Sequence, residues 1–222
     1  MIIVGIYVAT KVILNQSFLY KILSKMKISF LASHGGTAVR HIIAAIANNQ
    51  LQAEIGVVIT NNSDSAIYNW CNKNAVDAVC INGNTHSDEL ARDKAIYDSL
   101  VKAETDLIIL SGYMKKIGRT TLAGYSNRIL NIHPSLLPKH GGKGLYGDRV
   151  HQSVIDSGDK QSGATVQFIN EEYDEGPIFS QQIVEVEKGE TVETLKSKVQ
   201  AIEGELYLTS IRRILDDGLL HL

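Results

Sequence analysis

The sequence predicts an α/β protein with a mostly parallel, twisted sheet, helices on both of its faces and an antiparallel strand addition near the C-terminus. Two observations predict this fold class. After Met26, short runs rich in β-branched residues alternate with stretches of helical periodicity, which favours parallel strands joined by crossover helices. From residue 163 onward two strand-like runs follow each other directly, which favours antiparallel pairing.

The expected elements follow in chain order from these two patterns. A last amphipathic helix is expected from about Val192 to Leu215, with Thr191 as its N-cap. Apolar residues at helical spacing predict earlier helices over 37–49 and 87–103. Apolar, β-rich runs predict strands at residues 27–33, 55–60, 77–81, 106–113, 128–132, 163–170 and 178–186.

The composition is that of one ordinary globular domain. Of the 222 residues, 44% are hydrophobic and 21% charged, and the formal net charge of -2 gives no electrostatic reason to expect nucleic acid or an anionic membrane as a partner. Cys71 and Cys80 form no CxxC pair, so we expect a reduced, cytoplasmic protein in which both thiols are small apolar side chains. The partners that we expect are small-molecule substrates, with the chain a monomer or a homodimer.

The first 25 residues differ from the rest of the chain. Their apolar run is interrupted by Lys11 and Asn15, is too short to span a bilayer, and lacks a basic leading region and a small-residue cleavage site. We interpret residues 1–25 as an N-terminal extension, either upstream of the true start of the domain or as an added surface helix. No repeat, low-complexity tract or linker divides residues 26–222, which we expect to form one domain.

Four loops are candidate sites, because open parallel sheets bind ligands beyond the carboxyl ends of their strands. In the first, Ser33–Thr37, two glycines precede a helix N-terminus, so the residues are consistent with a tight turn and with a phosphate site. This loop matches neither GxGxxG nor the Walker A motif, which argues against dinucleotide or ATP binding. The second, Ser111–Gly118, is either an ordinary strand exit or a packing surface for something flat.

The third candidate lies at the end of the strand predicted over 128–132. Asn131 and His133 stand two residues apart in extended chain, so their side chains project on the same side. An amide and an imidazole in this arrangement can donate hydrogen bonds to one developing oxyanion. Pro134 and Pro138 stiffen the segment that follows, which suits a preorganised site. We therefore interpret the pair as functional, although a lone histidine is more often structural.

The fourth candidate is the turn Tyr173–Pro177. Asp174 followed by Gly176 and Pro177 is typical of a simple turn. If this loop faces His133, the carboxylate would hold the imidazole protonated and order a water for proton transfer. Metal and nucleophile chemistry is not indicated, because the sequence has no HExxH motif, no Cys/His set and no GxSxG elbow.

Four segments of the chain carry a resemblance to a known family. They are DLIILSGYMKKI (106–117), ILNIHPSLLPKHGG (129–142), YDEGPI (173–178) and VQAIEGELY (199–207). Together they resemble the phosphoribosylglycinamide formyltransferases, a branch of the folate-dependent formyltransferases. The resemblance runs from Met26 to the C-terminus, and it implies a Rossmann-like fold. It also implies transfer of a formyl group from the co-substrate 10-formyltetrahydrofolate to the primary amine of glycinamide ribonucleotide, a step of purine biosynthesis that needs no metal.

The resemblance assigns roles to individual residues. It implies that Asn131, His133 and Asp174 form the catalytic triad. Residues that it assigns to the acceptor substrate are Gly35, Gly36, Thr37, Pro134, Gln200 and Glu203. Residues that it assigns to the folate are Met114, Lys115, Ile117, Asn131, Ile169, Asn170, Glu171 and Tyr173.

Two segments depart from the family pattern. The family's phosphate loop usually reads Ser-Gly-x-Gly-Ser/Thr-Asn, whereas residues 33–38 read SHGGTA, and a histidine common in the family's VHF strand is Gln167 here. Because the loop bears on the acceptor, the alternative enzyme is a related N-formyltransferase that uses the same donor on an amino sugar or a hydroxylated amino acid. The alternative from another class is a folate- or nucleotide-binding module without turnover, against which an oxyanion donor pair argues.

Overall fold

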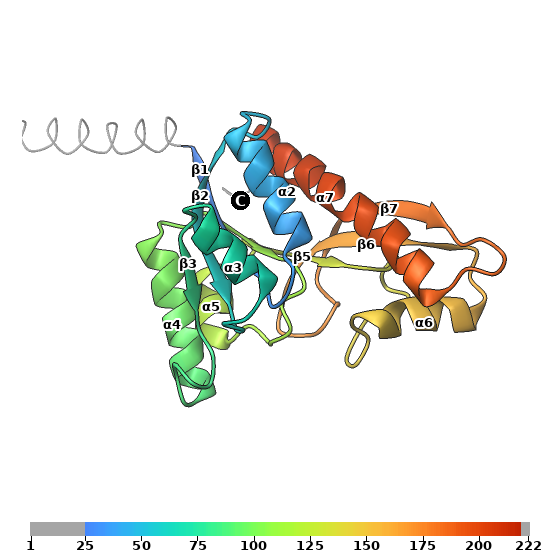
Figure 1. The fold of residues 1–222 in the computed structure, drawn as a ribbon, viewed down its shortest axis with the longest axis horizontal. Coiled ribbons are helices and arrows are strands. Elements are labelled where there is room, and N and C mark those ends of the chain that lie inside the picture. The colour runs from blue at the N-terminus through green and yellow to red at the C-terminus, as the bar shows by residue number, and fades with distance from the viewer. Residues whose placement is uncertain (1–24, 219–222) are drawn as a thin grey trace, which may run out of the picture.

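Seven strands form one sheet in the order β3-β2-β1-β4-β5-β6-β7 (Figure 1). The computed structural model describes residues 25–218, so the predicted extension lies outside the described residues except for its last residue. Neighbouring strands from β3 to β5 run parallel, and the β5–β6 and β6–β7 pairs are antiparallel. The predicted fold class is therefore confirmed. The strands are β1 (Met26–Leu31), β2 (Ala53–Thr60), β3 (Ala78–Cys80), β4 (Leu107–Leu110), β5 (Ile129–His133), β6 (Gln161–Phe168) and β7 (Ile178–Glu185).

Helices cover both faces of the sheet (Figure 1). One cluster of buried apolar side chains includes residues of α2, α3, α6 and α7, and a second cluster, on the other face, includes residues of α4 and α5. Full burial of one Ile or Leu side chain contributes about 1.5–3 kcal/mol, so these clusters outweigh exposed ion pairs in stabilising the fold. The helices are α2 (Thr37–Ala47), α3 (Ala66–Lys73), α4 (Glu89–Lys102), α5 (Arg119–Gly124), α6 (Asp148–Ser157) and α7 (Val192–Asp217).

Helix α7 begins where the sequence predicts and braces the sheet. Thr191 and Thr194 form a capping box, in which each side chain accepts the other residue's backbone N–H. Farther along, the fully buried Tyr207 donates its hydroxyl proton to the carbonyl of Leu110, the last residue of β4. This contact ties α7 to the carboxyl end of the sheet. Within residues 25–218, no helix is both long and apolar enough to cross a membrane.

The short helices α3, α5 and α6 are not predicted from the sequence. Helices of this length depend on tertiary contacts, because nucleating a helix is costly. In α5, the buried Asp93 of α4 accepts the backbone N–H groups of Thr120 at 2.7 Å and Thr121 at 3.1 Å. One strand is also shorter than predicted. The run expected at 106–113 leaves the sheet after Leu110, and Gly112 follows in a left-handed conformation with φ 60°.

Candidate active site

The carboxyl end of β5 projects two polar side chains beyond its parallel neighbour. Asn131 pairs with Leu110, the last residue of β4, so the segment from Asn131 to His133 extends past the end of that strand. Asn131 and His133 alternate with Leu130 and Ile132, which enter the core on the other face. The sequence therefore places both polar side chains on one side of the strand, as expected from their spacing.

The loop between β6 and β7 folds back and brings Asp174 to His133. The Nδ1 atom of His133 lies 3.4 Å from Oδ1 of Asp174, and the two side chains are 5% and 13% exposed. Two further donors reach the carboxylate: Gln167 Nε2 at 3.0 Å and the backbone N–H of Gly142 at 2.9 Å. Burial alone would raise the pKa of Asp174, but the contact with His133 and these two donors outweigh it and lower the pKa. The aspartate is therefore ionised beside the imidazole.

The second ring nitrogen of His133 is also engaged. Its Nε2 lies 2.8 Å from the backbone carbonyl of His140. Both ring nitrogens thus face acceptor oxygens, an arrangement that a doubly protonated imidazolium satisfies. An oxyanion that takes a proton donor from His133 has to compete with one of these two oxygens.

The segment that supplies this carbonyl is fixed to α6 and to the surface beside it. His140 Nδ1 lies 2.8 Å from the hydroxyl of Ser153, and its Nε2 lies 3.1 Å from Asp159 Oδ2. Lys139 pairs with the same carboxylate at 3.1 Å. The contacts with His140 and Lys139 lower the pKa of Asp159. Because the segment is held at both residues, its carbonyl has a defined position over His133.

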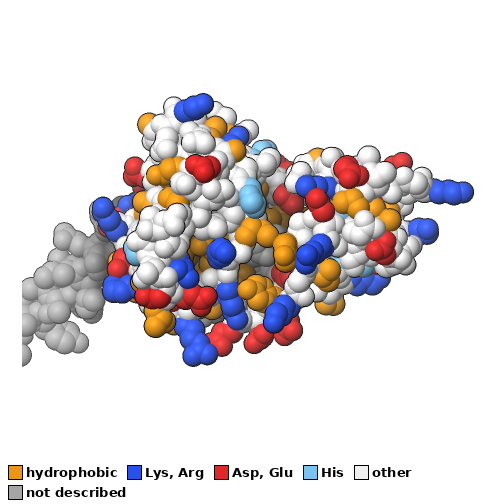
Figure 2. Space-filling view, turned by 60° about the horizontal axis from the view of Figure 1, so that its bottom comes forward, with side chains coloured by type: hydrophobic (Ala, Val, Ile, Leu, Met, Phe, Trp, Pro, Cys, Tyr) orange, Lys and Arg blue, Asp and Glu red, His pale blue; other side chains and the backbone are white. Residues whose placement is uncertain are grey.

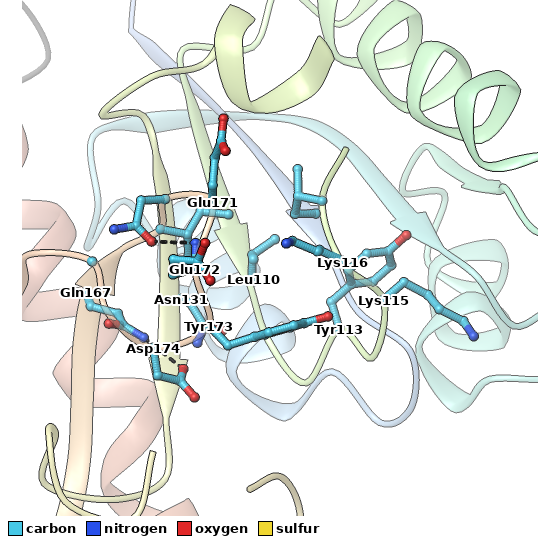
Figure 3. A pocket seen from close by; sticks show the side chains of 14 residues that line it. Leu110, Tyr113, Lys115, Lys116, Asn131, Gln167, Glu171, Glu172, Tyr173 and Asp174 are labelled. Carbon is cyan, nitrogen blue, oxygen red and sulfur yellow. Dashed lines mark hydrogen bonds between the residues drawn. The ribbon is translucent and has the colours of Figure 1, made fainter. Parts of the chain in front are cut away.

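A pocket opens beside Asp174, and most of its wall comes from the loops after β4 and β6 (Figure 3). Met114 is the one predicted folate residue that does not line it, and instead lines a neighbouring hollow. Predicted residues that do line it are Lys115, Ile117, Asn131, Ile169, Asn170, Glu171 and Tyr173. Lining residues that were not assigned to the folate from the sequence are Leu110, Tyr113, Lys116, Gln167, Glu172 and Gly176.

Aromatic side chains make this pocket suited to a flat ligand. The Nζ atom of Lys116 lies 5.5 Å from the centre of the Tyr173 ring, and the two side chains face each other across part of the pocket (Figure 3). Burial raises the pKa of Tyr113 to about 12, so its hydroxyl keeps its proton at neutral pH. The surface is hollowed between the two ends of the molecule, with charged side chains of both signs around the hollow (Figure 2).

All but one of the residues predicted for the acceptor substrate lie at α2 and α7, the helices on the opposite face of the sheet, and the exception is Pro134. Gly36 is the N-cap of α2, in a left-handed conformation with φ 60°, and no side chain of the described residues caps the first turn. The two helices pack closely, since a Cβ atom on Gly204 would come within 2.9 Å of the His41 ring. Glu203 precedes Gly204, and Thr37 lies one helical turn before His41, so this packing places Glu203 near the N-terminal turn of α2.

Two residues predicted to bind the acceptor amine differ in their surroundings. Glu203 is half-buried, and burial raises its pKa to about 7, an effect that His133 opposes. Gln200, one helical turn earlier, is exposed. Pro134, the remaining predicted residue, follows β5 and is half-buried. Among residues 25–218, no group of three or more His, Cys, Asp or Glu side chains is placed to hold a metal ion.

Comparisons with known proteins agree with this architecture. The sequence model of the formyl transferase family matches residues 26–211. The chain is 34% identical over 181 residues to phosphoribosylglycinamide formyltransferase of Haemophilus influenzae, covering 82% of this chain and 83% of that protein. It is 33% identical over 193 residues to the chloroplastic phosphoribosylglycinamide formyltransferase of Vigna unguiculata, covering 87% of this chain and 62% of the plant protein.

A solved structure gives the same result. Glycinamide ribonucleotide transformylase 1 from Symbiobacterium toebii superposes with a TM-score of 0.80 at 32% identity, covering 87% of this chain and 89% of that one. The chain thus spans nearly the whole of a bacterial relative but less than two thirds of the Vigna protein. These matches agree with the order of the strands and with the pairing of His133 with Asp174. The chain therefore belongs to the formyl transferase family, on the branch of the phosphoribosylglycinamide formyltransferases.

Proposed function

We propose that the protein transfers the formyl group of 10-formyltetrahydrofolate to the primary amine of glycinamide ribonucleotide, in purine biosynthesis. The observation that carries this proposal is the buried His133–Asp174 pair, whose carboxylate lines a pocket together with Asn131. The names of the relatives support the acceptor. A binding module without turnover has no need for a buried imidazole–carboxylate pair next to an amide donor.

The chemistry begins with attack of the acceptor amine on the formyl carbon. A C–N bond forms, and the carbonyl oxygen becomes an oxyanion in a tetrahedral intermediate. The amide of Asn131 and a ring N–H of His133 are the proposed donors to this oxyanion. Removing one preorganised donor of this kind typically costs about 2.7–4 kcal/mol of transition-state stabilisation.

Collapse of the intermediate breaks the bond between the formyl carbon and the folate nitrogen. The attacking amine loses one proton and the departing nitrogen gains one, so the protein needs to carry a proton between two sites. Asp174 is proposed to hold His133 in its cationic form, because it lies 3.4 Å from Nδ1 and its own pKa is lowered. The ring N–H that faces the carbonyl of His140 is then the one that turns to the oxyanion.

The two substrates are proposed to approach from opposite faces. The pocket beside Asp174, with Tyr113 and the backbone of residues 169–174, is the proposed folate site. The uncapped N-terminus of α2 at Gly35, Gly36 and Thr37 is the proposed site for the acceptor's phosphate, because free backbone N–H groups and the helix dipole favour an anion. Gln200 and Glu203 of α7 are proposed to bind the amine.

The organisation of the whole chain belongs to the same proposal. Residues 26–222 are proposed to be the formyltransferase domain, which the family match over residues 26–211 supports, with residues 1–25 as an extension. We propose a cytoplasmic enzyme that is a monomer or a homodimer.

An assay of tetrahydrofolate release tests donor and acceptor together. The purified full chain is given 10-formyltetrahydrofolate with glycinamide ribonucleotide, and in parallel with a panel of amino sugars and hydroxylated amino acids. We expect the ribonucleotide to give the highest kcat/KM. A chain that binds the donor but formylates another amine instead contradicts the proposed acceptor, and a chain that binds the donor and formylates none of them is a binding module.

A further inference from the structure

Gln167 lies among the proposed catalytic groups but has no part in the reaction described above. It stands on β6 directly opposite Asn131 in the antiparallel pairing of β5 and β6, so the two side chains share one face of the sheet. Its side chain is buried, and its Nε2 donates to Asp174 Oδ1 at 3.0 Å (Figure 3). Because an ionised carboxylate only accepts hydrogen bonds, the nitrogen end of the amide has to face Asp174.

The carbonyl oxygen at the other end of the same amide is a buried hydrogen-bond acceptor. Gln167 Oε1 has no hydrogen-bond partner among residues 25–218. Leaving a buried polar group unpaired costs about 1–3 kcal/mol, so such a group in a native protein calls for an explanation. Gln167, Asn131 and Asp174 line the same pocket, so this acceptor lies where the substrates are proposed to react.

Asn131 offers the donor that matches it. An amide side chain can present either its NH₂ group or its carbonyl oxygen to a ligand, and only the NH₂ group stabilises an oxyanion. One of the two N–H bonds can point to the oxyanion while the other points to an acceptor. Cβ atoms of directly opposite residues are about 4.5–5.5 Å apart, so a rotation of the Asn131 side chain brings its NH₂ group to Gln167.

We propose that Gln167 is a positioning residue that orients two catalytic groups at once. Its Nε2 holds Asp174 toward His133, and its Oε1 accepts one N–H of Asn131, which leaves the other N–H directed at the oxyanion. No hydrogen bond joins the two amides in the structure, so the contact with Asn131 forms when the substrates bind. This proposal rests on the proposed formyl transfer.

The first test removes both hydrogen bonds without changing the volume much. We expect Gln167→Met to lower kcat about tenfold, the equivalent of one hydrogen bond to a charged group, with little change in KM for the folate. Ser162→Ala is the matched control, because Ser162 lies on the same strand, is buried and has an unpaired hydroxyl, but does not line the pocket. A Gln167→Met enzyme with the kcat of the wild type overturns the proposal.

A double-mutant cycle tests whether Gln167 acts through Asn131. Effects of independent residues multiply, whereas effects of residues that act through each other do not. We therefore expect Gln167→Met to lower kcat by a smaller factor in an Asn131→Ala background than in the wild type, because only its bond to Asp174 is then left to lose. A second full loss in that background shows that Gln167 does not orient Asn131.

A third variant separates a positioning role from mere folding. Gln167→Glu keeps an acceptor toward Asn131, but when ionised it places a second carboxylate against Asp174 instead of a donor. Once protonated, the glutamate supplies one donor and one acceptor, as glutamine does. We expect its kcat relative to the wild type to rise as the pH is lowered. A constant ratio at every pH contradicts the proposed bond to Asp174. If the wild type itself shows no formyl transfer, the proposed function fails before this inference is tested.

Discussion

The two halves of the sheet contribute different things to the site. The parallel half, β3-β2-β1-β4, ends in loops such as Ser33–Gly36 and in the free N-terminus of α2, which present backbone groups suited to binding. The antiparallel half, β5-β6-β7, supplies Asn131, His133 and Asp174, which are suited to moving protons and stabilising charge. The antiparallel hairpin lets a loop fold back against β5, so a residue distant in sequence reaches His133. Binding and chemistry should therefore respond separately to substitution.

The largest effect is expected in the antiparallel half. Asp174→Asn should lower kcat on the order of a hundredfold, the size of a typical contribution from proton transfer, because a neutral amide cannot hold the imidazolium of His133. Donor binding, measured by titration with a folate analogue, should change little. Asp98→Asn serves as the control, since Asp98 makes an exposed pair with Lys94 on α4. A wild-type kcat in the Asp174→Asn variant would contradict the proposed proton relay.

A smaller effect, on KM instead of kcat, is expected in the parallel half. Gly36→Ala forces a side chain into a left-handed conformation and places Cβ 2.8 Å from Ile67, which should displace the helix N-terminus. Loss of a backbone hydrogen bond to a charged group predicts a rise of about tenfold in KM for glycinamide ribonucleotide, with kcat retained.

Gly189→Ala is the control for this variant. It has the same kind of left-handed backbone, with φ 86°, but no atom lies within 4 Å of the added Cβ. Steady-state kinetics of both variants distinguish a local effect on the phosphate site from general strain. An equal rise in KM for both variants would contradict a phosphate site at Gly36.

The smallest effect is expected on α7, and it depends on pH. The pKa of Glu203 is raised to about 7, so its carboxylate is mostly protonated below that pH and ionised above it. Only the ionised form is a strong acceptor for the substrate amine. Glu203→Gln should lower kcat/KM roughly fivefold at pH 8, the worth of one hydrogen bond, and less at pH 6.

The measurement is the ratio of kcat/KM between wild type and Glu203→Gln across this pH range. Glu205→Gln, an exposed neighbour on the same helix, should give a ratio that does not vary with pH. A ratio for Glu203→Gln that is equally flat would show that Glu203 does not titrate in contact with the substrate.

Elements with a strong periodic pattern could be predicted from the sequence, and short ones could not. All seven strands and the helices α2, α4 and α7 overlap their predicted ranges, because each buries a regular apolar stripe or run. The helices α3 and α6 are shorter and bury only a brief stripe, such as Ile67 and Cys71 in α3, and α5 has six residues. The example of α5 gives the reason, since its start is specified by Asp93 on another helix, and a local pattern carries no record of that contact.

The same difference holds for the residues of the site: local spacing could be read from the sequence, and contacts between distant segments could not. The spacing of Asn131 and His133 on one strand predicted that they share a side, whereas Asp174 was a partner of His133 only on the condition that its loop faces that residue, and the resemblance to a family supplied the pairing. Gln167 was noted as a departure from the family but not as a partner of Asp174, because the bond depends on strand pairing and on the return of the β6–β7 loop. No sequence pattern indicates that the backbone N–H of Gly142 binds Asp174, since every residue except proline carries that group.

The carbonyl of His140, which faces Nε2 of His133, has a consequence for substitutions at position 140. The acceptor belongs to the main chain, so any residue that tolerates the local φ of 55° presents the same oxygen. The side chain of His140 acts on this contact only through its bonds to Ser153 and Asp159, which hold the main chain in place. A substitution at position 140 would therefore reach His133 by moving a backbone oxygen, without removing any side-chain contact to the ring.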